Sequence, residues 1–344
     1  MKTVDKSYYN TVLSAAFSSC GKYLACGNVY GDIVIYKLSA LSNHSVEFFE
    51  EGLSKAPKNK ILLQASKTCH ISSLISNDQF LIAGIGDQIV GWSWNDLINA
   101  ESSNSCPKSA WNISIPKSSD NADTHADVNA LKITQNAETN LSILYAGCGD
   151  NKVHSFSLED GRLLRSYAGH TDYIHNIDIK DNVLVSGSED GFIRTWDCRT
   201  SEMINLLEPH RQKDVCRNDL GPWIGDVSLN DDWLLCGGGV RLSLWNLRNL
   251  TFPMSVFKKT KDDGIHVAKF HQDQILAGGM APYFSVLSYN NELHTKIESS
   301  SGTIYSYAVS SSQNSSAMLC IAGNGNLMDI SANFKFREYV IPFY

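Results

Sequence analysis

The chain has 344 residues, of which 43% are hydrophobic, 19% are charged and 10% are aromatic, and its formal net charge is −7. This composition supports a large globular core and excludes a disordered chain or a coiled coil. The negative charge argues against a dedicated nucleic-acid-binding module, which usually carries a strongly basic face. No apolar run is long enough for a membrane span, and residues 1–12 lack the apolar segment of a secretory signal.

A small residue followed by glycine recurs along the whole chain, each time at the end of a short apolar run. The seven pairs are Cys26-Gly27, Ala83-Gly84, Ala146-Gly147, Ser186-Gly187, Cys236-Gly237, Ala277-Gly278 and Ala322-Gly323. A repeat of about 40–45 residues that contains four short strands is typical of one blade of a β-propeller. We therefore predict an all-β fold, a seven-bladed β-propeller with four antiparallel strands per blade, that spans residues 1–344 as a single domain.

The register of the repeat supports this interpretation, because an isoleucine precedes four of the glycines by 13 residues in each case. The four isoleucines are Ile71, Ile174, Ile224 and Ile265. Each marks the start of the first strand of a blade. The approximate blades are 11–68, 69–120, 125–168, 170–210, 220–260, 262–298 and 302–344.

The expected strands follow in chain order. Blade one uses Val12–Phe17, Tyr23–Cys26 and Ile33–Leu38, and blade two begins at Ile71 and ends its third strand at Trp92–Trp94. Blade three uses Val128–Ile133, Ile143–Ala146 and Val153–Leu158, and blade four uses Ile174–Ile179, Val183–Ser186 and Ile193–Trp196. Blade five uses Ile224–Leu229, Trp233–Cys236 and Leu242–Leu247, and blade six uses Ile265–Phe270, Ile275–Ala277 and Phe284–Tyr289. Blade seven uses Ile304–Val309, Met318–Ala322 and Leu327–Ile330, with a fourth strand of its own from Arg337–Phe343, so residues 1–10 are left to lie over the seam.

Two long polar segments, Ser39–Lys60 and Asn95–Asp127, interrupt the period and are expected to be rim loops. In the second, Trp111, Ile113 and Ile115 predict the outer strand of blade two. The same segment contains Asp120, Asp123, His125 and Asp127, which could ligate a metal, but without rigid spacing they are interpreted as a solvated loop.

Blade four carries the most complete repeat. Gly169-His170 precedes it, Ser186 ends its second strand, Asp190-Gly191 forms the next turn and Trp196-Asp197 closes its third strand. This blade resembles the WD40 repeat family. The resemblance implies that His170, Ser186, Asp190 and Trp196 form a buried hydrogen-bonded set that holds the blade together.

Further strings narrow the resemblance. They are Phe17–Gly31, Gly169–His175, Trp223–Gly225, Trp233–Gly239 and Leu244–Arg248. These are similar to the family of WD40 subunits of the THO complex, which belongs to the TREX machinery that links transcription to mRNA export. This resemblance implies a nuclear, non-enzymatic scaffold whose partners are other THO subunits, with the coiled-coil subunits five and seven as first candidates and RNA contacted through the complex.

The sequence offers no catalytic motif. The nucleophile motif G-x-S-x-G and the phosphate-binding motif ending in G-K-[ST] are both absent from it. The nine cysteines are odd in number and none has C-x-x-C spacing, so we expect reduced thiols rather than disulfides or a zinc site, and no cofactor.

Two aromatic residues are the candidates for partner binding. Tyr173 and Trp223 each precede the first strand of a blade at the same register, which in a WD40 propeller opens on the face around the central channel, and aromatic residues are frequent hot spots. We expect the two rings to lie near each other, exposed for a partner or else packed under loops. Arg199 is a third candidate.

The alternative function rests on Trp196-Asp197-Cys198-Arg199, which resembles the box by which WD40 substrate receptors dock on the adaptor of the cullin-4 ubiquitin ligase, with Arg199 as the docking charge. The near copy Trp245-Asn246-Leu247-Arg248 has Asn in place of Asp, which weakens the case for a dedicated docking device.

Overall fold

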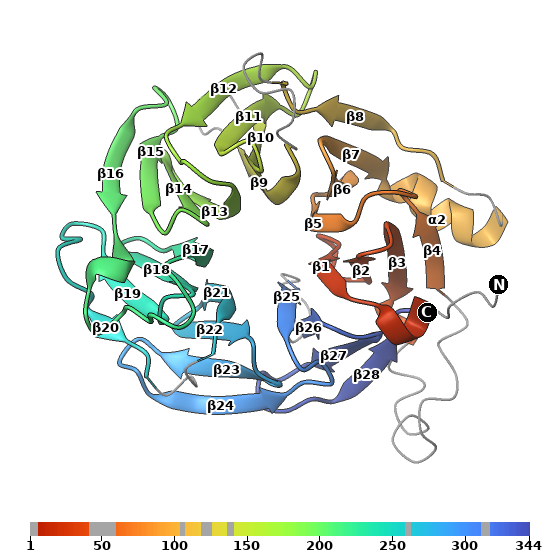
Figure 1. Ribbon diagram of the computed structural model, residues 1–344. Coiled ribbons are helices and arrows are strands. Elements are labelled where there is room, and N and C mark those ends of the chain that lie inside the picture. Colours follow the sequence, from red (N-terminus) through yellow and green to blue (C-terminus); the bar gives the residue numbers. More distant parts are fainter. Residues whose placement is uncertain are drawn as a thin grey trace. The chain divides into compact units, whose positions relative to one another are not determined.

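The computed structural model of the chain describes residues 6–40, 60–103, 107–117, 126–135, 141–258, 263–310 and 317–344. These residues form seven four-stranded antiparallel sheets in which neighbours along the chain are hydrogen-bonded (Figure 1). The predicted seven-bladed β-propeller with four antiparallel strands per blade is confirmed. The eight cysteines in the described residues are free thiols, and Cys106 lies outside them.

The seven sheets follow the chain in order. Blade one contains β1 (Val12–Phe17), β2 (Tyr23–Asn28), β3 (Asp32–Lys37) and β4 (Lys60–Gln64). Blade two contains β5 (Ile71–Ser76), β6 (Phe80–Ile85), β7 (Gln88–Ser93) and β8 (Trp111–Ser114). Blade three contains β9 (Val128–Gln135), β10 (Ser142–Cys148), β11 (Lys152–Ser157) and β12 (Leu163–Ala168). Blade four contains β13 (Ile174–Lys180), β14 (Val183–Ser188), β15 (Ile193–Asp197) and β16 (Met203–Leu207).

The remaining blades are built in the same way. Blade five contains β17 (Ile224–Leu229), β18 (Trp233–Gly238), β19 (Ser243–Asn246) and β20 (Ser255–Val256). Blade six contains β21 (Ile265–His271), β22 (Gln274–Gly279), β23 (Tyr283–Ser288) and β24 (Leu293–Glu298). Blade seven contains β25 (Ile304–Val309), β26 (Leu319–Gly323), β27 (Leu327–Ser331) and β28 (Tyr339–Pro342). The described residues also include three short 3₁₀ helices, η1 (Lys6–Tyr9), η2 (Leu38–Ala40) and η3 (Pro209–Arg211).

The structure corrects one expectation, because the start of the segment predicted as a rim loop is a helix, α2 (Trp94–Ser103). Trp94 and Leu97 are buried in the core of blade two, and the Trp94 indole N–H donates to Ser76 Oγ at 3.0 Å. Apolar residues three apart, as in Trp94, Leu97 and Ala100, are the signal of a helix face. In the described part of the chain no helix is long and apolar enough to cross a membrane.

Several of the repeated glycines lie where one blade packs against the next. A Cβ on Gly27 would lie 2.4 Å from Cγ2 of Ile71, and one on Gly187 would lie 2.6 Å from Cγ2 of Ile224. Each isoleucine begins the first strand of the following blade, so the small residue is required by the close packing of two sheets. The repeated glycine and the isoleucine that begins the following blade are therefore the two sides of one contact between neighbouring sheets.

A β-bulge occurs at the second residue of every first strand. In blade four, Ile174 pairs with Ser188 and Asn176 pairs with Gly187, so His175 is the extra residue. The same shift leaves Leu13, Ser72, Asn129, Gly225, His266 and Tyr305 as the extra residues of the other blades. A bulge re-aims its side chain out of the ladder.

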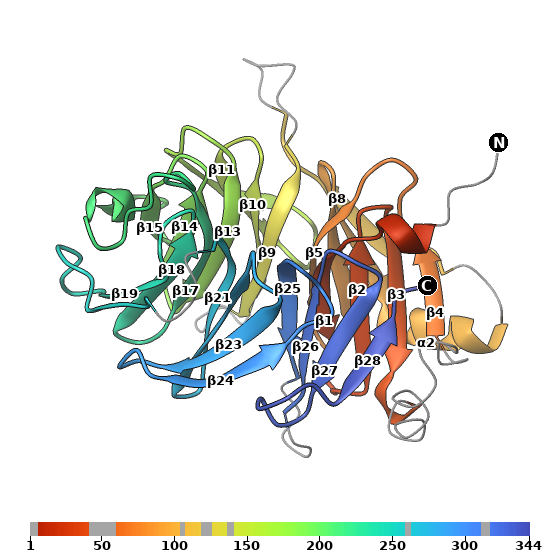
Figure 2. The same ribbon diagram turned by 60° about the horizontal axis from the view of Figure 1, so that its bottom comes forward.

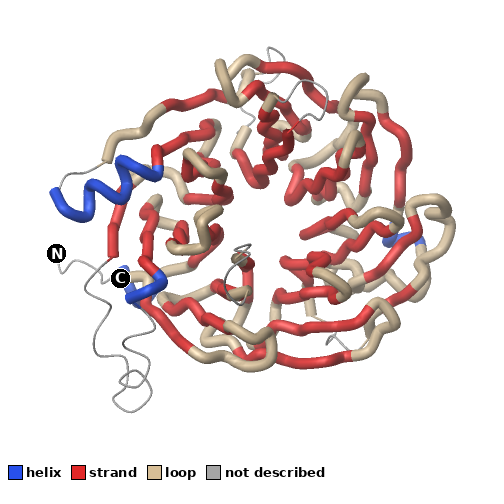
Figure 3. Tube along the Cα trace, turned by 180° about the vertical axis from the view of Figure 1, so that it is seen from behind, coloured by secondary structure: helices blue, strands red, loops and turns tan. Residues whose placement is uncertain are grey.

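The chain divides into two compact units. Unit one consists of residues 1–113, 282–284 and 296–344, and unit two of residues 114–281 and 285–295. Strands dominate both units (Figure 3). In unit one, blades one and seven share a core, and β25–β28 lie beside β1–β3 (Figure 2).

The seam of unit one is closed by polar side chains. The Asn10 side chain donates to Asn326 Oδ1 of blade seven at 3.3 Å and accepts from Asn28 Nδ2 of blade one at 2.9 Å. The Tyr344 hydroxyl accepts from Asn28 at 2.8 Å and donates to Asp32 Oδ2 at 2.6 Å. Residues 6–10 thus lie where blades one and seven meet, and blade seven has its own fourth strand, as expected. Residues 1–5 are outside the described ones.

Unit two contains a charge ladder, which we define as Lys132, Asp178, Asp226 and Lys269 on the first strands of four successive blades. Lys132 Nζ lies 3.0 Å from Asp178 Oδ1, and Lys269 Nζ lies 2.9 Å from Asp226 Oδ1. Asp178 Oδ2 also accepts from the backbone N–H of Leu229 on the next blade at 2.9 Å. The ladder therefore ties neighbouring blades together by charge.

The charge ladder makes stability depend on pH. Burial alone would raise the pKa of Asp178, but Lys132, Lys269 and the Leu229 N–H outweigh burial and hold that pKa well below its usual range. A depressed carboxyl pKa stabilises the fold above the unfolded-state value of about 3.9, and this contribution is lost as the pH falls through the folded-state value. We expect Asp178→Asn to lower the free energy of unfolding by on the order of 2 kcal/mol at pH 7.

This difference from the wild-type protein should shrink steadily below about pH 4. Urea denaturation of both proteins at several pH values measures it. Asp231→Asn is the control, because that carboxylate is 78% exposed and should change stability little at any pH. A difference for Asp178→Asn that does not vary with pH would contradict the assignment.

Candidate partner-binding face

The structure brings the four residues of the blade-four set together. His170 Nδ1 lies 2.9 Å from Asp190 Oδ2, and His170 Nε2 lies 2.8 Å from Ser186 Oγ. The Trp196 indole N–H donates to the same Ser186 hydroxyl at 2.9 Å. The side chains of His170 and Asp190 are 0% and 3% exposed, so their polar atoms face one another and are shielded from any substrate.

Arg194 joins this set, which the sequence did not indicate. Its guanidinium lies 3.0 Å from Asp190 Oδ2. Burial would raise the pKa of Asp190, but hydrogen bonding and charge from His170, together with the backbone N–H groups of Thr171 and Phe192, hold it well below its usual range. Burial lowers the pKa of His170. The set is therefore a carboxylate that is compensated by a fixed cation, and its geometry serves the stability of the blade.

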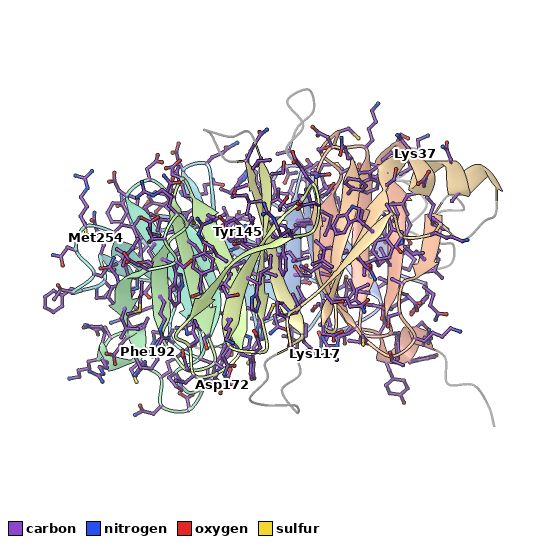
Figure 4. All side chains as sticks on the ribbon, turned by 90° about the horizontal axis from the view of Figure 1, so that it is seen from above. Lys37, Lys117, Tyr145, Asp172, Phe192 and Met254 are labelled. Atoms are coloured by element: carbon purple, nitrogen blue, oxygen red, sulfur yellow. The ribbon has the colours of Figure 1, made fainter. Side chains whose placement is uncertain are left out.

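Tyr173 and Trp223 lie in what we call the aromatic row: Tyr173, His175, Trp223 and His266. The rings of Tyr173 and His175 have centroids 5.0 Å apart, His175 and Trp223 are 5.9 Å apart, and Trp223 and His266 are stacked at 5.4 Å. The row crosses the starting ends of β13, β17 and β21. Figure 4 labels Asp172, next to Tyr173, at this end of the sheets together with Phe192.

Exposure and charge set the character of the aromatic row. Tyr173 is 40% exposed, while Trp223 is half-buried and its indole N–H donates to Leu220 O at 2.8 Å. Burial, with a smaller effect of His175, lowers the pKa of His266 to about 4, so this imidazole is neutral at pH 7. Glu189 pairs with His175 at 2.8 Å. The row thus offers flat aromatic rings beside an acidic group.

The two histidines of the row could have been found from the sequence. His175 and His266 each follow the isoleucine that begins a first strand, which is the bulge position of every blade. The bulge turns both side chains toward Trp223. His170 therefore belongs to the buried blade-four set and His175 belongs to the aromatic row, although the two are only five residues apart in the chain.

Arg199 is separate from the aromatic row in its contacts. Its side chain is 67% exposed and makes two bonds to Asp197, Nε to Oδ1 at 3.0 Å and Nη2 to Oδ2 at 2.7 Å. Exposed ion pairs of this kind contribute little stability. In the loop predicted to be solvated, Asp120, Asp123 and His125 lie outside the described residues, and Asp127 is described.

Known proteins resemble this chain over its whole length. The family described as Nucleolar protein 10-like, N-terminal domain, a β-propeller, matches residues 132–334. THO complex subunit 6 of Drosophila melanogaster is 34% identical and covers 100% of this chain and 93% of its own length. The Danio rerio homologue is 31% identical, covering 97% of each chain, and the Homo sapiens protein is 32% identical, covering 97% of this chain and 93% of its own. The chain therefore belongs to the THO complex subunit 6 family, with a β-propeller of the nucleolar protein 10-like type.

Proposed function

We propose that this chain is a non-enzymatic scaffold subunit of a nuclear THO/TREX assembly, and that it helps to couple transcription and mRNA processing, including splicing, to mRNA export through protein–protein contacts. The observation that carries the proposal is the similarity to relatives named THO complex subunit 6 over 97–100% of this chain. The buried blade-four set supports it too, because its ionisable groups are used within the fold.

The partners in this proposal are other THO subunits, with the coiled-coil subunits five and seven as first candidates. RNA is reached through the complex, since a net charge of −7 disfavours direct binding to a phosphate backbone. The propeller binds by docking: its strands hold short loops in a fixed array, so little conformational entropy is lost when a partner's helix or extended segment lies across them.

The aromatic row is the contact surface that we propose. Aromatic side chains dominate the hot spots of protein interfaces, and Met280, 43% exposed, extends the apolar surface beside Trp223. The four rings come from three blades of unit two and are positioned by bulged strands, so the surface exists before a partner arrives. Tyr173 and Trp223 are the residues on which binding should depend most.

The test is affinity purification of the full chain from nuclear extract, followed by mass spectrometry. We expect the wild-type protein to recover THO subunits and Tyr173→Ala/Trp223→Ala to recover them at least tenfold less, because hot-spot truncations weaken binding by about 2 kcal/mol or more each. The melting temperature of the variant reports whether the fold is intact, and Tyr173→Ala alone serves as a milder variant because its ring is more exposed.

The matched control is Phe252→Ala/Met254→Ala, two apolar residues of unit two that are 68% and 67% exposed. It should recover THO subunits normally. If the aromatic-row variant folds and recovers its partners undiminished, the contact surface lies elsewhere. Recovery of the cullin-4 adaptor in place of THO subunits, with its loss on Arg199→Ala, would favour the ubiquitin-ligase function instead.

A further inference from the structure

Blade three contains a group of three side chains of the types that bind metal ions. Cys148 ends β10, Asp150 lies in the following turn and His154 lies on β11. One ligand atom from each, the thiol sulfur, a carboxylate oxygen and an imidazole nitrogen, all lie within 4.8 Å of one another. The side chains of Asp150 and His154 are 5% and 3% exposed, and Cys148 is 0% exposed.

A comparison with blade four shows that the blade-three group lacks a permanently charged basic side chain. Blades three and four align without gaps across this turn, so Asp150 corresponds to Asp190, His154 to Arg194 and Cys148 to Ser188. Asp190 is compensated by the Arg194 guanidinium at 3.0 Å.

Among the residues that the structure describes, His154 is the one basic side chain within ion-pair distance of Asp150, with its Nε2 2.9 Å from Oδ2, and an imidazole is a cation only when it is protonated. A carboxylate this deeply buried needs positive charge close to it. In blade three, His154 stands at the position of Arg194, and together with Cys148 it offers ligand atoms for a metal cation in place of the guanidinium.

The surroundings of His154 fit a metal ligand. Its Nε2 faces Asp150, while Nδ1 lies 2.8 Å from Ser166 Oγ of β12. A metal-bound histidine almost always donates its second ring N–H to an oxygen acceptor, commonly a carboxylate, a backbone carbonyl or water, which fixes the ring and its tautomer. Ser166 can accept that bond, so the orientation of the ring is already set by the neighbouring strand.

We propose that Cys148, Asp150 and His154 bind one Zn²⁺ ion, with a water molecule in the fourth position. A sulfur, a nitrogen and an oxygen ligand in tetrahedral geometry suit zinc rather than calcium or magnesium, which take oxygen ligands. Binding converts the Cys148 thiol to a thiolate and releases its proton to solvent. Bond lengths of about 2.0–2.3 Å place tetrahedral ligand atoms about 3.3–3.6 Å apart, so side-chain movements of roughly an ångström complete the site.

The ion would stabilise blade three as Arg194 stabilises blade four, by supplying the positive charge. The role of the ion in this proposal is to compensate the buried carboxylate, and it is independent of the proposed partner contact. It also explains how a chain without C-x-x-C spacing could hold zinc, because the ligands come together across a turn between two strands.

Cobalt is the probe that reports on the ligands directly. The full chain is reduced, freed of metal with a chelator and titrated with Co²⁺. We expect one Co²⁺ per chain, the visible bands of tetrahedral cobalt, and a thiolate-to-cobalt charge-transfer band that Zn²⁺ abolishes by displacement. Zn²⁺ alone should raise the melting temperature.

Matched variants decide the outcome. Cys148→Ser should remove the charge-transfer band and weaken binding at least tenfold, and it should still fold because blade four carries serine at the corresponding position. Ser166→Ala should weaken binding by about 10–100-fold while the band is kept. Cys236→Ser, which removes a buried thiol beside Ser243 in blade five, should change neither. If wild-type protein binds no Co²⁺, or if Cys148→Ser keeps the band, the zinc site is wrong.

Discussion

Replacing Lys269 by methionine should destabilise the protein by about 3–5 kcal/mol, the largest effect that we expect from one substitution. Lys269 and Asp226 are almost completely buried, with side chains 8% and 2% exposed. Burial raises the pKa of Asp226, and the Lys269 ammonium acts against that shift. Without the ammonium, Asp226 must ionise without its partner or take up a proton, and either is unfavourable. Asp178 also loses a stabilising charge.

Urea denaturation at pH 7 measures this loss. The double variant Asp226→Asn/Lys269→Met should lose less free energy of unfolding than the two single variants lose when added together. The reason is that removing both charges leaves neither of them buried without a partner. Lys180→Met is the control, since Lys180 is 37% exposed and pairs with an exposed aspartate, and its loss should change the free energy of unfolding little. A Lys269→Met variant as stable as that control would show that the charge ladder does not hold the blades together.

Arg217→Met is expected to have the next largest effect, about 3 kcal/mol or more. Arg217 is 5% exposed and its guanidinium donates to four backbone carbonyls. The acceptors are Gly239 at 2.7 Å, Asp263 at 2.8 Å, Gly238 at 2.9 Å and Val240 at 3.0 Å. A hydrogen bond to a charged group contributes about 1.5–3 kcal/mol, and methionine would leave buried carbonyls unsatisfied.

The same substitution should weaken partner recovery, because Gly239 donates its backbone N–H to Trp223 O at 2.9 Å and so positions the aromatic row. Arg217→Lys should restore only part of the stability, since an ammonium cannot reach all four carbonyls in the fork geometry of a guanidinium. Arg248→Met is the control: its side chain is 83% exposed and should be dispensable. Equal stability of the Arg217→Met and Arg248→Met variants would contradict this role.

The architecture could be predicted because it depends on local, repeated requirements. A glycine must stand where the isoleucine of the next blade packs, as at Gly187 and Ile224, and each strand must be apolar where two sheets enclose it. Such requirements repeat with the blade, so they appear in the sequence as a period. The helix α2 was not predicted because it lies in a segment with no counterpart in the other blades.

The candidate site could be predicted only in part. Tyr173 and Trp223 share a register, and the structure indeed links them, but through His175, whose direction is set by a bulge. Arg194 and Arg217 carry no signal, because a single arginine in a strand or loop is usually a surface residue. Their partners lie up to 46 residues away in the chain and are brought close only by folding.

The sequence by itself determined the number of blades and the order of their strands, because spacing along one chain is enough to specify a repeated sheet, whereas the blade-four set was implied by the resemblance to WD40 repeats. Only the tertiary structure decided which buried charges pair between blades, which rings meet at the aromatic row, and which three side chains of blade three converge. Each of these depends on the approach of neighbouring strands or sheets within a few ångströms. A periodic sequence determines that neighbouring strands and sheets pack together. The bulges and turns then determine which side chains meet.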